Sequence, residues 1–209
     1  MSQALVVYGG WEGHYPGEIA DIFAELLGEI GFGVTMSDRL DSFTSADDLR
    51  AFQLIVLHWT QGDIAPNQFA ALREAVHGGV GLAGIHGGLG DAFRNIPEFQ
   101  YMVGGQWVAH PGNDGVTYDV TVTDLNHPIT QGVPNFTVTS EQYYMHIDPA
   151  IHTLATTRFG DTVMPVAWTK RYGSGKVFYH SLGHHPDVVR MPEVLRLTRQ
   201  GLAWAAAEA

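Results

Sequence analysis

Short apolar runs alternate with segments of helical periodicity through the first part of the chain. The runs Ala4–Tyr8, Leu54–Leu57 and Gly79–Ile85 are typical of strands that are buried on both faces. Between them, Pro16–Ile30 carries apolar residues three and four positions apart, and Pro66–Val76 begins with proline and stops at a glycine pair. This alternation predicts an α/β fold with a doubly wound, mainly parallel sheet flanked by helices.

The second part of the chain has a different pattern. Three segments, Val116–Val122, Ile151–Thr157 and Val163–Thr169, alternate apolar and polar residues as half-exposed strands do. Val177–His180 is again apolar enough for a buried strand, and Met191–Ala207 has the periodicity of an amphipathic helix. These elements are expected to complete the same sheet.

Composition narrows the class of protein. No linker, repeat or low-complexity segment interrupts the pattern, so a single domain over residues 1–209 is expected. Asp and Glu number 22 against 11 Lys and Arg, which disfavours binding to nucleic acid or to an anionic membrane surface. No signal-peptide pattern and no apolar run near the ~20 residues of a membrane span are present, so a cytoplasmic location is expected. The chain has no cysteine, which excludes a thiolate nucleophile.

Histidines mark the ends of four predicted strands. They are His14, His58, His86 and the pair His184 and His185. Because the carboxyl ends of parallel strands meet at one edge of a sheet, these side chains are expected to share one crevice. His86 is the strongest candidate, because a buried strand ends on it and two glycines follow, as at a strand–elbow–helix turn.

Further groups could join this crevice. His110 lies in a glycine-bearing loop, and Glu12 and Glu141 offer carboxylates. Histidine titrates near neutrality and is the commonest metal ligand, so the cluster predicts either acid–base chemistry or a zinc-type site. No ligand spacing resembles His-Glu-x-x-His, so the metal alternative depends on proximity alone. Its candidate ligands are His86, His110 and His184.

Several histidines are better explained by structure than by chemistry. His77 and His152 lack a glycine context and are expected to be surface or packing residues. His180 lies inside a buried strand, where a hydrogen-bonded core residue is expected. His58 and Trp59 form either a packed strand end or an aromatic platform for a sugar.

Seven motifs, in order along nearly the whole chain, resemble the ThuA-like (trehalose utilisation) family. They are Gly9–His14, Gly84–Gly88, Gly104–Pro111, Asn126–Thr130, Glu141–Tyr143, Gly183–His184 and Gly201–Ala205. The resemblance implies a class I glutamine amidotransferase-like, flavodoxin-like three-layer sandwich, with His86 at the elbow where amidotransferases hold cysteine. The family often has Asp-Glu-x-Tyr where this chain has Ser140 before Glu141, so the first acid is lost.

The resemblance implies a link with the catabolism of trehalose and related disaccharides, alongside oxidoreductases that make 3-keto sugars. One hypothesis is an enzyme, a hydrolase or lyase acting on a sugar or keto-sugar, with His86, Glu141 and His184 as catalytic residues. Expected substrate-binding residues are Trp11, Glu12, His14, His58, Trp59 and Tyr143. The alternative is a non-catalytic protein that binds carbohydrate or serves as a regulatory subunit. Either function fits a small-molecule carbohydrate partner and a homo-oligomer, with a divalent metal such as zinc as the one cofactor considered.

Overall fold

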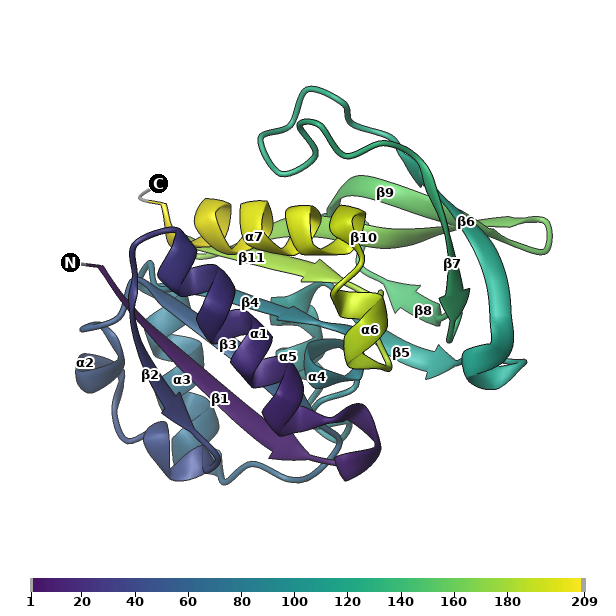
Figure 1. The fold of residues 1–209 in the computed structure, drawn as a ribbon. Coiled ribbons are helices and arrows are strands. Elements are labelled where there is room, and N and C mark those ends of the chain that lie inside the picture. The colour runs from purple at the N-terminus through teal and green to yellow at the C-terminus, as the bar shows by residue number, and fades with distance from the viewer. Residues whose placement is uncertain (1, 208–209) are drawn as a thin grey trace.

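The computed structural model describes residues 2–207. Its main sheet has nine strands in the order β2-β1-β3-β4-β11-β10-β9-β6-β7 (Figure 1). Its strands are β1 (Gln3–Gly10), β2 (Gly33–Ser37), β3 (Leu54–Thr60), β4 (Gly81–Ile85), β6 (Val116–Val122), β7 (Phe136–Ser140), β9 (His152–Phe159), β10 (Thr162–Tyr172) and β11 (Gly175–His180). Two further strands, β5 (Gly105–Ala109) and β8 (Tyr144–Ile147), pair with each other as a separate antiparallel ribbon.

The sheet has two parts. Strands β2, β1, β3, β4 and β11 pair in parallel, which confirms the doubly wound arrangement predicted from the sequence. Strands β10, β9, β6 and β7 continue the sheet with antiparallel pairing. We call these four strands the antiparallel wing. The half-exposed strands predicted in the second part of the chain lie there.

Helices cover both faces of the parallel part and make it a three-layer sandwich (Figure 1). Helices α1 (Pro16–Glu29) and α7 (Pro192–Ala206) pack on one face, and α2 (Ala46–Leu49), α3 (Pro66–His77) and α5 (Pro97–Val103) on the other. Alternate residues of a strand therefore enter different cores: Ala4 packs with the α1 and α7 side, and Leu5 with the α3 side. Two short helices, α4 (His86–Gly90) and α6 (Pro186–Val189), follow β4 and β11.

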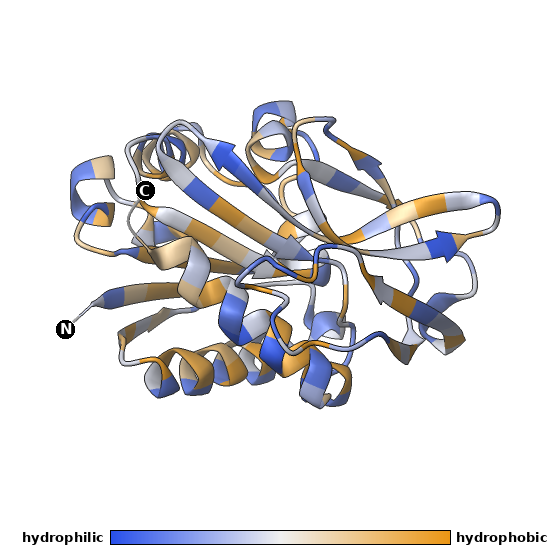
Figure 2. Cartoon of the chain, turned by 90° about the horizontal axis from the view of Figure 1, so that it is seen from above, coloured by the Kyte–Doolittle hydropathy of each residue, from blue (hydrophilic) through white to orange (hydrophobic). Residues whose placement is uncertain are grey.

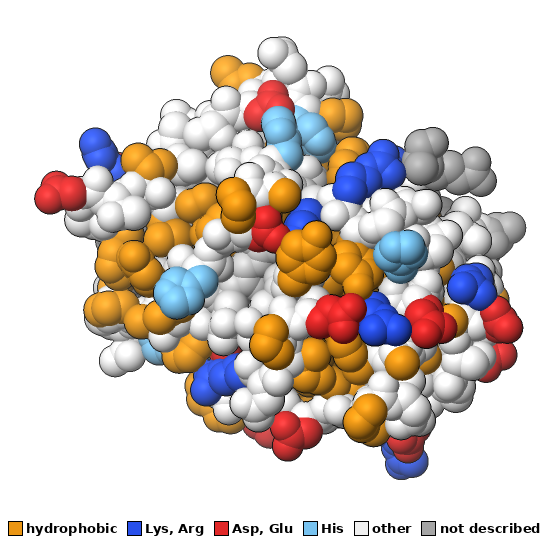
Figure 3. Space-filling view, turned by 180° about the vertical axis from the view of Figure 1, so that it is seen from behind, with side chains coloured by type: hydrophobic (Ala, Val, Ile, Leu, Met, Phe, Trp, Pro, Cys, Tyr) orange, Lys and Arg blue, Asp and Glu red, His pale blue; other side chains and the backbone are white. Residues whose placement is uncertain are grey.

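The predicted strands and long helices agree with the structure, whereas three strands and the helices α5 and α6 are additions. The strands β5, β7 and β8 were not predicted, since each has only four or five residues and a mixed composition. The helices carry both apolar and polar positions, as amphipathic covers do (Figure 2). In residues 2–207 no helix is long and apolar enough to cross a membrane. On the face shown in Figure 3, acidic and basic side chains are interspersed.

Candidate active site

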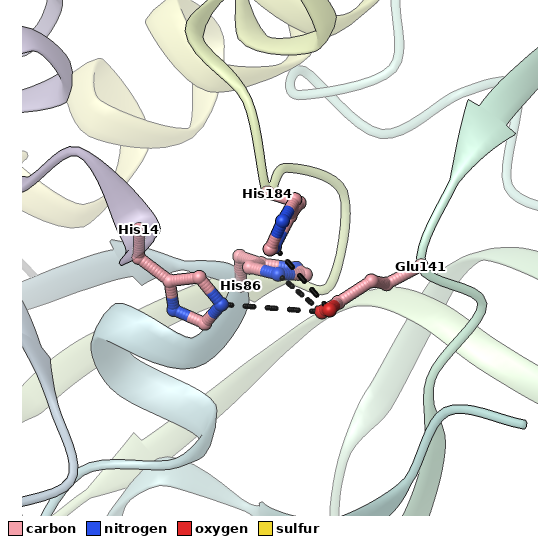
Figure 4. Close-up of side chains that lie close together, drawn as sticks. All are labelled: His14, His86, Glu141 and His184. Carbon is pink, nitrogen blue, oxygen red and sulfur yellow. Dashed lines mark hydrogen bonds and ion pairs between the residues drawn. The ribbon is translucent and has the colours of Figure 1, made fainter. Parts of the chain in front are cut away.

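Four side chains from both parts of the sheet point toward one another at the carboxyl edge of the parallel strands (Figure 4). His14 ends the 3-10 helix Glu12–His14 that follows β1, and His86 comes directly after β4. His184 lies in the turn that follows β11, and Glu141 comes directly after β7. The parallel part therefore supplies histidines, and the antiparallel wing supplies a carboxylate.

The two glycines after His86 have a steric explanation. A Cβ atom on Gly87 would lie 2.4 Å from the His14 ring, and one on Gly88 would lie 2.0 Å from Nδ1 of His58. Both positions must stay without a side chain so that two histidine rings can pack against the turn. His86 itself has a φ of 49°, in the left-handed region, which costs a non-glycine residue of order 1–3 kcal/mol. The predicted strained elbow is confirmed.

The turn that carries His184 is tied to the antiparallel wing by a hydrogen bond. His184 has a φ of 80°, and the hydroxyl of Ser140 donates a hydrogen bond to the carbonyl of Gly183. This bond ties the end of β7 to the His184 turn. The neighbouring His185 faces outward, with Nε2 3.2 Å from a carboxylate oxygen of Asp114.

The carboxylate of Glu141 is the centre of the cluster. His86 Nε2 lies 3.1 Å and His14 Nε2 3.9 Å from its Oε2 atom. His184 Nδ1 lies 3.3 Å and His110 Nδ1 3.6 Å from its Oε1 atom. Every ion-pair partner that the structure gives Glu141 is thus a histidine. The cluster is enclosed, since the side chains of His86 and Glu141 are 1% and 6% exposed.

Hydrogen bonds fix the rings in place. His86 donates from Nδ1 to the carbonyl of Ser181 at 2.8 Å, and the Tyr143 hydroxyl lies 2.9 Å from Nε2. Tyr143 also stacks on the His86 ring, with centroids 4.2 Å apart. His14 is held through Nδ1, which lies 2.8 Å from the hydroxyl of Thr60.

Burial and the neighbouring side chains shift the pKa values of the four clustered residues. Burial lowers the pKa of His86 below its ordinary value and that of His14 to about 2, so both rings are neutral near pH 7. Burial by itself would raise the pKa of Glu141, but the neighbouring His184 and His86 rings bring it below its usual value. The contact with Glu141 raises the pKa of His184. The cluster therefore combines one carboxylate, one histidine that favours its charged form and two neutral imidazoles.

The remaining predicted binding residues differ in how they relate to this cluster. Trp11 is 48% exposed and meets the His14 ring edge-on at 4.7 Å, so it borders the site, and Glu12 beside it is exposed. His58 is fully buried behind the site, where its Nε2 donates to the carbonyl of His14 at 3.2 Å. Trp59 is half-buried, and a Cβ on Gly9 would lie 2.6 Å from its ring.

The histidines expected to be structural lie away from the cluster. His180 is fully buried and bonds to the Thr198 hydroxyl at 2.9 Å, which confirms the hydrogen-bonded core residue. His77 and His152 are exposed, and His152 Nε2 lies 2.8 Å from a carboxylate oxygen of Asp124.

Two groups that hold the site were not identified from the sequence. One is the Ser181 carbonyl, which no side-chain pattern can reveal. The other is the Thr60 hydroxyl, whose position at the end of the strand that carries His58 could have indicated it.

Comparison with known structures identifies the fold class. A GMP synthase component from Thermoplasma acidophilum matches with a TM-score of 0.61 at 14% identity, covering 99% of this chain and 94% of that one. A protein described as ThuA-like from Parabacteroides merdae ATCC 43184 matches with a TM-score of 0.81 at 20% identity, covering 99% and 90%. A cytoplasmic protein from Salmonella typhimurium LT2 has a TM-score of 0.67 at 15% identity, covering 98% and 97%. At these identities the likeness shows the fold alone.

The fold is thus that of the class I glutamine amidotransferase-like α/β proteins, with histidine at the elbow. A family model described as ThuA, trehalose utilisation, matches residues 3–205, and the chain belongs to this family. A comparison with curated proteins found no match. Family membership links the chain to sugar metabolism.

Proposed function

We propose that this protein is an enzyme that acts on a disaccharide or keto-sugar derivative of the trehalose type. The observation that carries the proposal is the single enclosed carboxylate of Glu141 with four histidine rings around it. Carboxylates and histidines exchange protons readily near neutrality when they are held together, and such clusters serve as general acids and bases. The open edge of a parallel sheet is also where α/β enzymes bind their ligands.

The chemistry that suits this cluster is elimination next to a carbonyl group. In a 3-keto sugar the C2–H bond is acidified, and Glu141 would accept its proton as the electron pair moves into the enolate. The C1–O bond then breaks, and the departing oxygen takes a proton from His184. His86, fixed by Ser181 and Tyr143, would keep Glu141 in position for the transfer.

Trp11 would provide the sugar contact. Its indole is 48% exposed and borders both His14 and His184, with ring centroids 4.7 Å and 6.3 Å away. Exposed aromatic faces beside polar groups suit sugar rings, which present both C–H and hydroxyl groups.

Two finer expectations belong to this proposal. A divalent metal ion such as zinc would polarise the substrate carbonyl, although the proton transfers above use only groups of the chain. A cytoplasmic location is supported by the fold shared with two Salmonella typhimurium proteins described as cytoplasmic.

The second candidate function is carbohydrate binding without turnover. The exposed Trp11 beside polar rings favours it, because recognition needs only stacking and hydrogen bonds. A binding protein would retain the disaccharide unchanged.

The test is to incubate the protein with trehalose and with its 3-keto derivative and to measure the released monosaccharide. We expect turnover of the keto-sugar by the wild type and none by His86→Ala, with circular dichroism showing that the variant is folded. His152→Ala, which alters a histidine–carboxylate pair on the surface, is the matched control and should keep full activity. Binding of the sugars without turnover would establish the second candidate. Activity retained in His86→Ala would refute the assigned site.

A further inference from the structure

We propose that His14, His86, His184 and Glu141 form a binding site for one divalent first-row transition metal ion, for which zinc is the probe. This set differs from the ligands expected from the sequence, because it gains His14 and Glu141 and loses His110. The inference concerns the same site as the proposed function, but metal binding does not depend on which sugar is turned over.

The spacing of the donor atoms fits a metal ion. One donor atom from each of the four residues lies within 4.8 Å of all the others. For zinc bonded at about 2.0–2.1 Å in a tetrahedron, neighbouring donor atoms lie about 3.3 Å apart. The contacts of Glu141 with His86 and His184 are 3.1 Å and 3.3 Å, and that with His14 is 3.9 Å. The atoms thus need to move by less than about 1 Å to reach coordination distance.

The position of the hydrogen on His86 is compatible with the same ion. The Ser181 carbonyl can only accept, so the hydrogen of the neutral ring is on Nδ1, and Nε2 carries a lone pair. That lone pair is 3.1 Å from a Glu141 oxygen, which also offers lone pairs. The Tyr143 hydroxyl, 2.9 Å from Nε2, can donate a hydrogen bond to the same lone pair, but it brings no positive charge to the contact with Glu141. A cation between these two acceptors, either a proton or a metal ion, would relieve the contact.

A second ring nitrogen is also open toward the centre. Nδ1 of His184 and Nδ1 of His110 are both buried without a hydrogen-bond partner in residues 2–207, and each forms only an ion pair with Glu141, at 3.3 Å and 3.6 Å. Buried polar atoms without a partner are rare in folded proteins and call for an explanation. A metal ion at the centre of the cluster would supply a hydrogen-free partner for His184, which, unlike His110, belongs to the four-residue donor set.

The outer sides of the ligands are held as metal-binding histidines usually are. Such histidines use the other ring nitrogen to bond a carbonyl, a carboxylate or a hydroxyl, which fixes the tautomer. His86 bonds the Ser181 carbonyl, and His14 meets the Thr60 hydroxyl at 2.8 Å. For His184 the structure gives no such hydrogen bond within residues 2–207, and the carboxylate of Asp114 has an oxygen within 4.8 Å of a nitrogen of its ring.

The donor types select the ion. Three imidazoles and one carboxylate suit zinc and its neighbours in the first transition row, whereas calcium and magnesium prefer oxygen donors throughout. Glu141 and His184 carry the proton transfers of the proposed function only while no ion is bound, because a bound ion would take them as ligands. His110, which lies 3.6 Å from Glu141 but outside the four-atom set, is then the histidine left for proton transfer.

The experiment uses the tag-free protein, stripped with a chelator and then titrated with zinc or cobalt. We expect one equivalent of tightly bound zinc by elemental analysis after gel filtration, a raised melting temperature, and a cobalt absorption spectrum typical of nitrogen and oxygen donors. His14→Ala and His184→Ala should each weaken zinc binding by about 100-fold or more. Thr60→Val, which removes only the partner of His14, should weaken it by about 10-fold.

Two controls decide the ligand set. His110→Ala and His152→Ala should bind zinc like the wild type. Failure of the stripped wild type to bind one equivalent would overturn the inference, as would loss of zinc in His110→Ala with retention in His14→Ala. If His14→Ala is unfolded by circular dichroism, Thr60→Val provides the same comparison. These readouts do not involve turnover, so zinc binding without activity on keto-sugars would refute the proposed function and leave the metal site standing.

Discussion

Two buried carboxylates show how differently the same charge can be compensated in this protein. Asp91 forms a two-pronged ion pair with Arg94, with distances of 2.6 Å and 2.7 Å, and the guanidinium also lies 4.8 Å from the Trp107 ring. Glu141 is equally enclosed, and its ion pairs within residues 2–207 are all with histidines. Arginine stays protonated under all conditions that a folded protein meets, so the charge of the Asp91 pair is fixed.

The comparison separates structural from functional use of a buried acid. The Asp91 pair stabilises the turn after α4, where the Asp91 carbonyl also accepts a hydrogen bond from Gln61. Histidine side chains exchange protons near neutrality and bind metal ions, so under the two proposals above the Glu141 site would change its state while the fold stays the same. Variants at the two carboxylates should therefore fail in different ways.

The largest effect is expected for Glu141→Gln, which keeps the shape and removes the charge. Turnover of a 3-keto disaccharide should fall by about 1,000-fold, equivalent to about 4 kcal/mol in the barrier. The free energy of unfolding in urea should change by less than about 1 kcal/mol, because no arginine or lysine is left without its partner. Turnover within tenfold of the wild type would show that this carboxylate is structural too.

Asp91→Asn is expected to have a smaller effect, and on stability instead of turnover. The free energy of unfolding should fall by about 2 kcal/mol, below the usual cost of breaking a fully buried pair, because the Arg94 side chain is 42% exposed. Turnover per folded molecule should stay within tenfold of the wild type. Urea denaturation combined with steady-state kinetics checks both, and a loss of turnover as large as that of Glu141→Gln would erase the distinction between the two acids.

The smallest effect is expected for Arg94→Lys, which keeps the charge of the pair. Lysine cannot reproduce the two parallel hydrogen bonds or lie flat beside Trp107, so we expect a loss of about 1 kcal/mol in the free energy of unfolding. The same urea measurement applies. A cost greater than that of Asp91→Asn would mean that geometry, and not charge, holds this turn.

The sequence was most informative where local pattern and strand direction were enough. The apolar runs predicted the parallel strands, and their common polarity predicted that the histidines at their ends would share one crevice. That is correct for His14, His86 and His184 but wrong for His58, which is buried behind the site, and for His185, which faces outward. The contact with Glu141 could not be derived in this way, because it follows β7, a five-residue strand whose place in the sheet depends on pairing with β6. The direction of His58 was equally hidden, since its ring packs into the space left by Gly88.

Ser140 affects the net charge that the site would have with a divalent ion bound. As a hydroxyl it donates to the Gly183 carbonyl, which an ionised aspartate could not do, and it brings no second negative charge to the cluster. A divalent ion facing Glu141 alone would keep one unit of positive charge. A pocket with that surplus holds an enolate oxygen more strongly than the neutral ketone from which it forms, and such a preference lowers a reaction barrier.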